Sequence, residues 1–181
     1  MNITPLPIAG AYIIEHSVAQ DHRGIFSRLF CAESLAVPLA GRQIVQINHS
    51  LTVQPGAVRG LHFQRSPHAE MKIVRCLKGR VFDVAVDLRT DSPTFLKWVS
   101  MELSPTAHRA IIIPEGCAHG FQTLEPDCEL LYLHTAFYNK SAEGGLRYDD
   151  PLLSIKWPLP ATDLSVRDQN HPLLDLTNIK V

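Results

Sequence analysis

Short apolar runs interrupted by Pro and Gly dominate this chain, whereas long stretches with helical periodicity are scarce. The clearest run lies at residues 81–88, where hydrophobic and polar side chains alternate with the period of two that is typical of a β-strand. This alternation places Phe82, Val84, Val86 and Leu88 on one face. Similar runs predict further strands at residues 44–53, 57–64, 71–77, 95–103, 108–113, 118–124 and 129–138. Many strands at regular spacing, separated by turn signals, predict an all-β sandwich or barrel.

Helix is predicted in only two places. A short helix is expected around residues 31–35, ended by Pro38 because proline interrupts a helix, and a turn or two is expected after Asp163. From about residue 150 the chain contains four prolines, and this segment is expected to be irregular and packed over the barrel. With 181 residues, of which 45% are hydrophobic, the chain can bury one sizeable core, so a single domain over residues 1–181 is expected.

The overall composition limits the classes of partner. A formal net charge of −1 and a pI near 6.7 provide no general field to attract nucleic acid or an anionic membrane, so an anionic ligand must be bound locally. The first residues lack the features of a signal peptide and no apolar run is long enough to span a membrane, which predicts a cytoplasmic protein. The four cysteines form no Cys-x-x-Cys pair and are expected to be free thiols.

Three residues on predicted strands suit proton transfer beside a carbonyl group. His62 could remove a proton, Lys72 could stabilise the enolate oxygen, and Tyr132 could return a proton. Alternation places Lys72 on the same face as Val74 and Cys76, where a lysine is costly to desolvate unless its charge is used. From spacing alone, each residue also has a structural interpretation: a lysine at a sheet edge that reaches water, a tyrosine of the core, and a lone strand histidine.

Two other kinds of site have weaker support in the sequence. His119 lies in residues 114–119, which match the second metal-binding motif of cupin barrels, but the first motif requires a second histidine and Gln64 stands there instead. His62 and His119 alone provide too few donors for a tight zinc, iron or manganese site, so no metal site is predicted. Cys117 is expected to be a buried, inert thiol, because nothing indicates an acyl substrate or a third orienting group.

Several motifs occur in order along most of the chain, from about residue 21 to residue 172. Together they resemble the dTDP-4-dehydrorhamnose 3,5-epimerases and related enzymes that act on deoxysugar nucleotides. The motifs lie at residues 21–26, 46–50, 59–64, 82–89, 92–95, 113–121, 155–158 and 164–168. The resemblance implies a cupin-type jelly-roll barrel with a few short helices, a homodimer, and no requirement for a metal or an organic cofactor.

The resemblance also implies a role for each residue of the proton-transfer set. His62 would be the general base, Tyr132 the acid and Lys72 the group that stabilises the enolate. Asp168 would hydrogen-bond His62 and keep its proton affinity high. The substrate would be a nucleotide-linked 4-keto-6-deoxyhexose such as dTDP-4-dehydro-6-deoxyglucose, whose C4 carbonyl acidifies the hydrogens at C3 and C5. Removal from one face and return to the other would invert one or both centres, the reaction of an isomerase.

The substrate-binding residues implied by the resemblance would surround the sugar, the diphosphate and the base, with Tyr138 stacking on the base. They are Arg23, Phe26, Arg28, Gln46, Asn48, Arg59, His119, Tyr138, Glu143 and Arg167. Arg28 stands where the family commonly has Glu, which reverses the charge at the nucleotide end. Cys117 and Tyr148 stand where Phe and Trp are usual, and none of these departures touches the proton-transfer set.

Two other functions remain open at the level of the sequence. One is a metal-dependent cupin oxygenase or isomerase, which would contain stoichiometric metal and would lose its activity to chelators. The other is a sugar-nucleotide binding protein without catalysis, which would bind a ligand without exchanging its protons. The presence of His62, Lys72 and Tyr132 argues against a chain that has lost catalysis.

Overall fold

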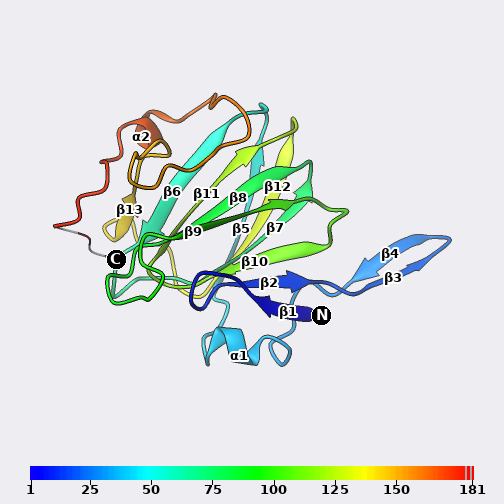
Figure 1. The fold of residues 1–181 in the computed structure, drawn as a ribbon. Coiled ribbons are helices and arrows are strands. Elements are labelled where there is room, and N and C mark those ends of the chain that lie inside the picture. Colours follow the sequence, from blue (N-terminus) through cyan, green and yellow to red (C-terminus); the bar gives the residue numbers. More distant parts are fainter. Residues whose placement is uncertain (178, 180) are drawn as a thin grey trace.

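The computed structural model describes residues 1–177, 179 and 181 of the chain. Two antiparallel sheets face each other and form most of the molecule (Figure 1). The six-stranded sheet has the order β1 (Asn2–Pro5), β2 (Tyr12–Glu15), β10 (Arg109–Ile113), β7 (Lys72–Lys78), β12 (Cys128–His134) and β5 (Gln46–Thr52). The five-stranded sheet has the order β13 (Glu143–Gly145), β6 (Val58–Gln64), β11 (Cys117–Thr123), β8 (Val81–Asp87) and β9 (Trp98–Leu103).

The main core lies between the two sheets. Val74 and Leu130 reach it from the larger sheet, and Ala85 and Phe121 reach it from the smaller one. Burial of these apolar side chains is the main favourable term that holds the sheets together. All the strands that the hydrophobic pattern predicted are present, with ends that differ by a few residues. The structure therefore confirms the predicted all-β jelly-roll barrel.

A second apolar cluster covers the outer face of the smaller sheet. Val84 and Val86 of β8 point outward and pack beneath Leu153 and Trp157 of the C-terminal segment. Through this contact the proline-containing segment lies over the smaller sheet. The alternating polar positions of β8 point inward, and Asp83 is fully buried there. A strand that the sequence describes as half-polar is thus buried on both faces, with its acidic side chains inside the barrel.

The two helices in the described part of the chain are each a single turn. The turn expected after Asp163 is present as α2 (Val166–Gln169), but the helix expected around residues 31–35 is displaced to α1 (Ala36–Leu39). The prediction that Pro38 ends a helix is wrong, because Pro38 lies inside α1. Proline is tolerated in a first turn because the N–H groups there have no acceptor within the helix.

The hydrophobic pattern did not predict the shortest strands. Strands β1 to β4 and β13 have three or four residues each, which is too short for alternation to be recognised. Of these, β3 (Val18–Asp21) and β4 (Gly24–Ser27) form a two-stranded hairpin that extends away from the barrel (Figure 1). Among the described residues, no helix has the length and apolar character needed to cross a membrane.

Candidate active site

A hollow of about 550 Å³ opens into the barrel, and its walls come from both sheets. His62 of β6 and His119 of β11 line it from the smaller sheet. Lys72 of β7 and Tyr132 of β12 line it from the larger sheet. The fold therefore brings together the base, the cation and the acid that the sequence suggested, although they are separated by long stretches of chain.

His62 is held by a carboxylate from the C-terminal segment. Its Nε2 donates a hydrogen bond of 2.7 Å to Oδ1 of Asp168, and the Gly60 N–H donates to Oδ2 at 3.3 Å. Asp168 lies in the first turn of α2, where its own N–H donates to the capping hydroxyl of Ser165 at 3.0 Å. The carboxylate fixes the proton on Nε2, so Nδ1 keeps the lone pair that a base requires.

The Asp168 carboxylate is charged at any ordinary pH. Burial alone would raise its pKa, but the hydrogen bond and charge of His62, the Gly60 N–H and the charge of Arg167 outweigh burial and hold the pKa at about 2. Asp168 is 3% exposed, so little water screens its attraction to the imidazole ring. The arrangement would stabilise the imidazolium that forms when His62 accepts a proton.

Close packing of two glycines places His62 opposite His119. Gly60 has φ +128°, and a Cβ atom there would lie 2.6 Å from the Gly120 Cα and 2.8 Å from the His119 carbonyl oxygen. Only a residue without a side chain allows β6 and β11 to approach this closely. His62 and His119 are direct partners in the register of the two strands. Both imidazoles consequently lie on the wall of the same hollow.

Lys72 is buried, as its position on an apolar face predicted. It is 7% exposed, and its Nζ donates to the His62 carbonyl oxygen at 3.4 Å and forms an ion pair with Oε1 of Glu70 at 3.1 Å. A lysine ammonium has three N–H groups. These two contacts leave one N–H without an acceptor among the described residues, so it can be given to an oxygen atom of a ligand.

Tyr132 is held in its neutral form. Burial raises the pKa of its phenol well above the usual value, and the hydrogen bond with Ser50 only partly opposes this shift. Its Oη lies 3.1 Å from the Ser50 Oγ, and its ring packs edge-on against His119 with centroids 6.1 Å apart. A neutral phenol in a partly buried wall can donate a proton to a bound ligand.

His119 has a buried acidic partner of its own. Its Nε2 donates to Oδ2 of Asp83 at 2.8 Å, and both side chains are almost completely buried. His62 and His119 thus each direct one nitrogen toward a separate carboxylate. The atoms of His62, Asp168 and His171 that could bind a metal ion lie within 4.8 Å of one another. In the described part of the chain, this is the one group of three such residues. Within that group, Asp168 and His62 already hydrogen-bond each other.

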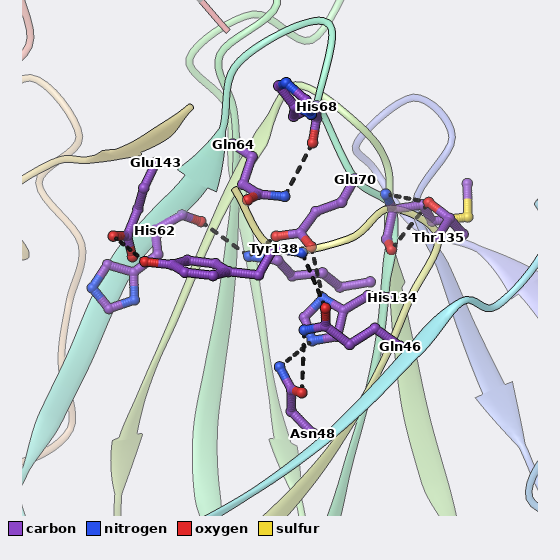
Figure 2. A network of polar contacts seen from close by, with 12 residues as sticks. Gln46, Asn48, His62, Gln64, His68, Glu70, His134, Thr135, Tyr138 and Glu143 are labelled. Atoms are coloured by element: carbon purple, nitrogen blue, oxygen red, sulfur yellow. Dashed lines mark hydrogen bonds and ion pairs between the residues drawn. The ribbon is translucent and has the colours of Figure 1, made fainter. Parts of the chain in front are cut away.

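Five of the other predicted substrate-binding residues also line the hollow. They are Asn48, Arg59, Tyr138, Glu143 and Arg167. The Tyr138 hydroxyl donates to Glu143 at 3.1 Å, and Arg167 forms an ion pair with the other oxygen of that carboxylate at 2.7 Å. Gln46 lies just outside, where its Oε1 accepts from the Tyr138 N–H at 3.0 Å (Figure 2). Arginines and polar side chains therefore surround the mouth of the hollow, as a diphosphate would require.

Three predicted residues lie elsewhere in this chain. Arg23 and Phe26 belong to the β3–β4 hairpin, where they line a separate shallow surface, and Arg28 directly follows the hairpin. Arg23 forms an ion pair of 2.6 Å with its neighbour Asp21, and Phe26 is 75% exposed. Within one chain, these residues and the hollow do not form a single site.

The structure adds polar residues to the hollow that the sequence did not suggest. Ser50, Gln64, Glu70 and His134 all line it. The alternation of a strand offers a signal for all four, because side chains two positions apart share a face. Glu70 is two positions before Lys72, and His134 is two positions after Tyr132. Ser50 is two positions after Asn48, and Gln64 is two positions after His62.

Cys117 has the properties of an inert thiol. It is 4% exposed, and burial together with the nearby charge of Asp87 raises its pKa to about 12. A thiol that stays protonated at physiological pH is a poor nucleophile. The prediction that Cys117 takes no part in the chemistry agrees with this environment.

Comparison with known proteins identifies the family. A family model described as dTDP-4-dehydrorhamnose 3,5-epimerase matches residues 5–175. The chain belongs to this family. The resemblance of the sequence motifs to the dTDP-4-dehydrorhamnose 3,5-epimerases is thereby confirmed, and so is the prediction of an enzyme of the isomerase class.

Individual members of the dTDP-4-dehydrorhamnose 3,5-epimerase family match along nearly the whole chain. The enzyme of Sinorhizobium fredii is 44% identical over 96% of this chain and 90% of its own length. The enzyme of Salmonella typhimurium is 43% identical over 97% of this chain and 96% of its own length. The crystal structure of a dTDP-6-deoxy-D-glucose-3,5-epimerase from Legionella pneumophila, in complex with dTDP-4-keto-L-rhamnose, has a TM-score of 0.92 and 40% identity, with 98% and 94% of the two chains covered.

Proposed function

We propose that this protein inverts C3 and C5 of a dTDP-linked 4-keto-6-deoxyhexose and so forms dTDP-4-dehydrorhamnose. The observation that carries the proposal is the hollow in which the His62–Asp168 pair, Lys72 and Tyr132 converge from four separate elements. The family relationship supports the substrate, since the matched Legionella enzyme binds dTDP-4-keto-L-rhamnose.

The geometry suggests how each inversion proceeds. The C4 ketone acidifies the hydrogens on its neighbouring carbons, and Nδ1 of His62 takes one of them as a proton. The electron pair moves to the C4 oxygen, where the free N–H of Lys72 stabilises the enolate. Tyr132 then donates its phenolic proton to the opposite face of the carbon, which inverts that centre. Rotation of the sugar ring within the hollow would present the second carbon to the same residues.

The arginines and the tyrosine at the mouth of the hollow support the binding of the nucleotide. Arg59 and Arg167 carry forked guanidinium groups that match phosphate oxygens, and Tyr138 offers an aromatic face for the base. Arg167 and Tyr138 both contact Glu143 in the free enzyme. We infer that the diphosphate takes over the Arg167 contact when the substrate binds.

A second copy of the chain is part of this proposal. β5 is an edge strand of the larger sheet, and Ile47 and Leu51 on it are 61% and 50% exposed. Apolar side chains at alternating positions of an open edge favour association with another chain. In a homodimer the projecting hairpin would carry Arg23 and Phe26 to the hollow of the other subunit. This placement would account for predicted site residues that lie far from the hollow of their own chain.

We also propose that the enzyme works in the cytoplasm. All four cysteines are free thiols, and three of them are buried. Free thiols are the usual state in a reducing compartment, where glutathione and thioredoxin prevent disulfides. The nucleotide-sugar substrate class agrees with this location.

Solvent exchange tests the proposed reaction directly. The purified protein is incubated with dTDP-4-keto-6-deoxyglucose in D2O, and deuterium is followed at each carbon by NMR. The proposal predicts incorporation at C3 and C5 together with inversion of both. GDP- and CDP-linked keto sugars serve as controls for the nucleotide. If neither carbon of the dTDP-linked sugar exchanges, the proposed function is refuted.

A further inference from the structure

A chain of hydrogen bonds connects the mouth of the hollow to Lys72. The Gln46 Nε2 donates to Oδ1 of Asn48 at 3.2 Å, and the Asn48 Nδ2 lies 3.3 Å from Nε2 of His134. His134 Nδ1 contacts Oε2 of Glu70 at 2.7 Å, and the other Glu70 oxygen receives the Lys72 ammonium at 3.1 Å. Figure 2 shows Glu70, His134 and Asn48 one after another along this chain of contacts.

The chemistry of each group fixes the direction of this chain. A carboxylate only accepts hydrogen bonds and an ammonium only donates them, so the proton of His134 lies on Nδ1 and points to Glu70. The Nε2 of His134 is then the acceptor for Asn48. Every donor in this series of hydrogen bonds points toward Glu70, the anion that accepts from both His134 and Lys72.

Glu70 is therefore buried beside a catalytic cation without being part of the proton-transfer set. The exposed fractions of the Glu70, Lys72 and His134 side chains are each 9%. Burial alone would raise the pKa of Glu70, but the hydrogen bond from His134 and the charge of Lys72 outweigh it, so the pKa lies below its usual value. An ammonium that is taken out of water needs such a partner to remain protonated.

We propose that Glu70 is a positioning residue of the active site: its carboxylate, oriented by His134, holds the Lys72 ammonium in place and aimed into the hollow. The inference rests on the proposed function, because it concerns the role of Lys72 in stabilising the enolate. Glu70 itself has no hydrogen atom to give, and its two oxygen atoms contact Lys72 and His134. Its loss would act on the reaction only through the lysine.

Other charged or titratable groups face the same hollow and must be distinguished from Glu70. They are His49, His62, His119, Tyr132, Arg59, Arg167 and Glu143. None of them is altered in a Glu70→Gln variant, which keeps the size of the side chain and removes only its charge. A change in the pH dependence of that variant can thus be assigned to the Glu70 site.

The test is a pH profile of kcat/KM for substrate exchange in the full-length protein. In Glu70→Gln, Lys72 loses its opposite charge, so the alkaline limb should move down by about one to three pH units. Glu70→Asp keeps the charge one methylene farther away and should move the limb in the same direction by less. Glu102→Gln is the matched control, because Glu102 forms an ion pair of the same 3.1 Å length with Arg80 at an exposed site. Its profile should match that of the unaltered protein.

The outcomes separate this inference from the proposed function. No exchange by the unaltered protein would overturn both, since Lys72 would have no enolate to stabilise. Normal exchange by the unaltered protein with an unmoved alkaline limb in Glu70→Gln would overturn the role of Glu70 alone. If Glu70→Gln does not fold, Glu70→Asp decides the question in the same way. A purely structural ion pair would lower the melting temperature of these variants and leave the limb where it is.

Discussion

Replacing Asp168 with Asn tests the assigned base more sharply than replacing His62, because it leaves the imidazole in place. Asp168 has a pKa of about 2 against an ordinary value of 3.8. Each pKa unit corresponds to about 1.36 kcal/mol, so the surroundings favour the charged carboxylate by about 2.5 kcal/mol. Asp168→Asn removes this charge from beside His62, and the free energy corresponds to a factor of about 60 in an equilibrium constant.

An amide cannot satisfy both groups that the carboxylate contacts. If the amide oxygen of the introduced side chain faced His62, its NH2 group would face the donor N–H of Gly60, which now contacts Oδ2 at 3.3 Å. If the amide were reversed, its NH2 group would face His62 and would move the imidazole proton to Nδ1, the nitrogen that must be free. Either orientation opposes proton abstraction, so the loss should be at least about 60-fold.

The assay is the initial rate of deuterium incorporation with saturating substrate. Asp149→Asn is the control, since Asp149 is a surface carboxylate paired with Arg147 at 2.6 Å. This control should keep the rate of the unaltered protein. If Asp168→Asn kept more than about a third of that rate while folding normally, the assignment of the His62–Asp168 pair as the base would be refuted.

Four further predictions follow from the site and from the sheet edge. His62→Ala should abolish exchange at both carbons, and NMR detection of residual exchange would contradict its role as the base. Tyr132→Phe should retain exchange but lose inversion, since abstraction and return of the proton are separate steps; chiral analysis of the product decides this. The folded pKa of Asp168 lies below 3.8, so its contribution to stability is present above that pH and is lost as the pH falls toward 2. Acid denaturation followed by circular dichroism should accordingly show a flatter pH dependence between pH 4 and 2 in Asp168→Asn. Leu51→Asp should convert a dimer to a monomer in analytical ultracentrifugation, whereas Val37→Asp, at a position that is 82% exposed on α1, should not.

The sequence predicted the barrel well because its long strands have a strict period. Alternation in β8 placed Val84 and Val86 on one face, and the structure has them on one face. The pattern could not tell what covers that face, because Leu153 and Trp157 reach it from a distant segment without periodicity. The helix near Pro38 was misplaced for a local reason. Proline is unfavourable in the interior of a helix but is tolerated in its first turn, where Pro38 lies.

The sequence could name the site residues that lie within recognisable motifs. It could not name those that are brought together by contacts between distant strands. In the sequence, Tyr132 could equally be a core tyrosine and Lys72 a lysine at a sheet edge. Only the folded barrel shows that both line one hollow with His62. Glu70 and His134 share faces with Lys72 and Tyr132 by simple alternation. Their hydrogen bond, however, joins residues from separate segments, and no periodicity within one strand reports such a contact.

The partner of His62 comes from far along the chain, 106 residues later. The barrel strands that line the hollow precede α2 in the chain, so synthesis reaches them before it reaches the carboxylate that contacts His62. The proposed base therefore depends on the docking of the C-terminal segment across the smaller sheet. A protease that removed this segment would take away Asp168, the partner of His62, together with Arg167 at the mouth of the hollow.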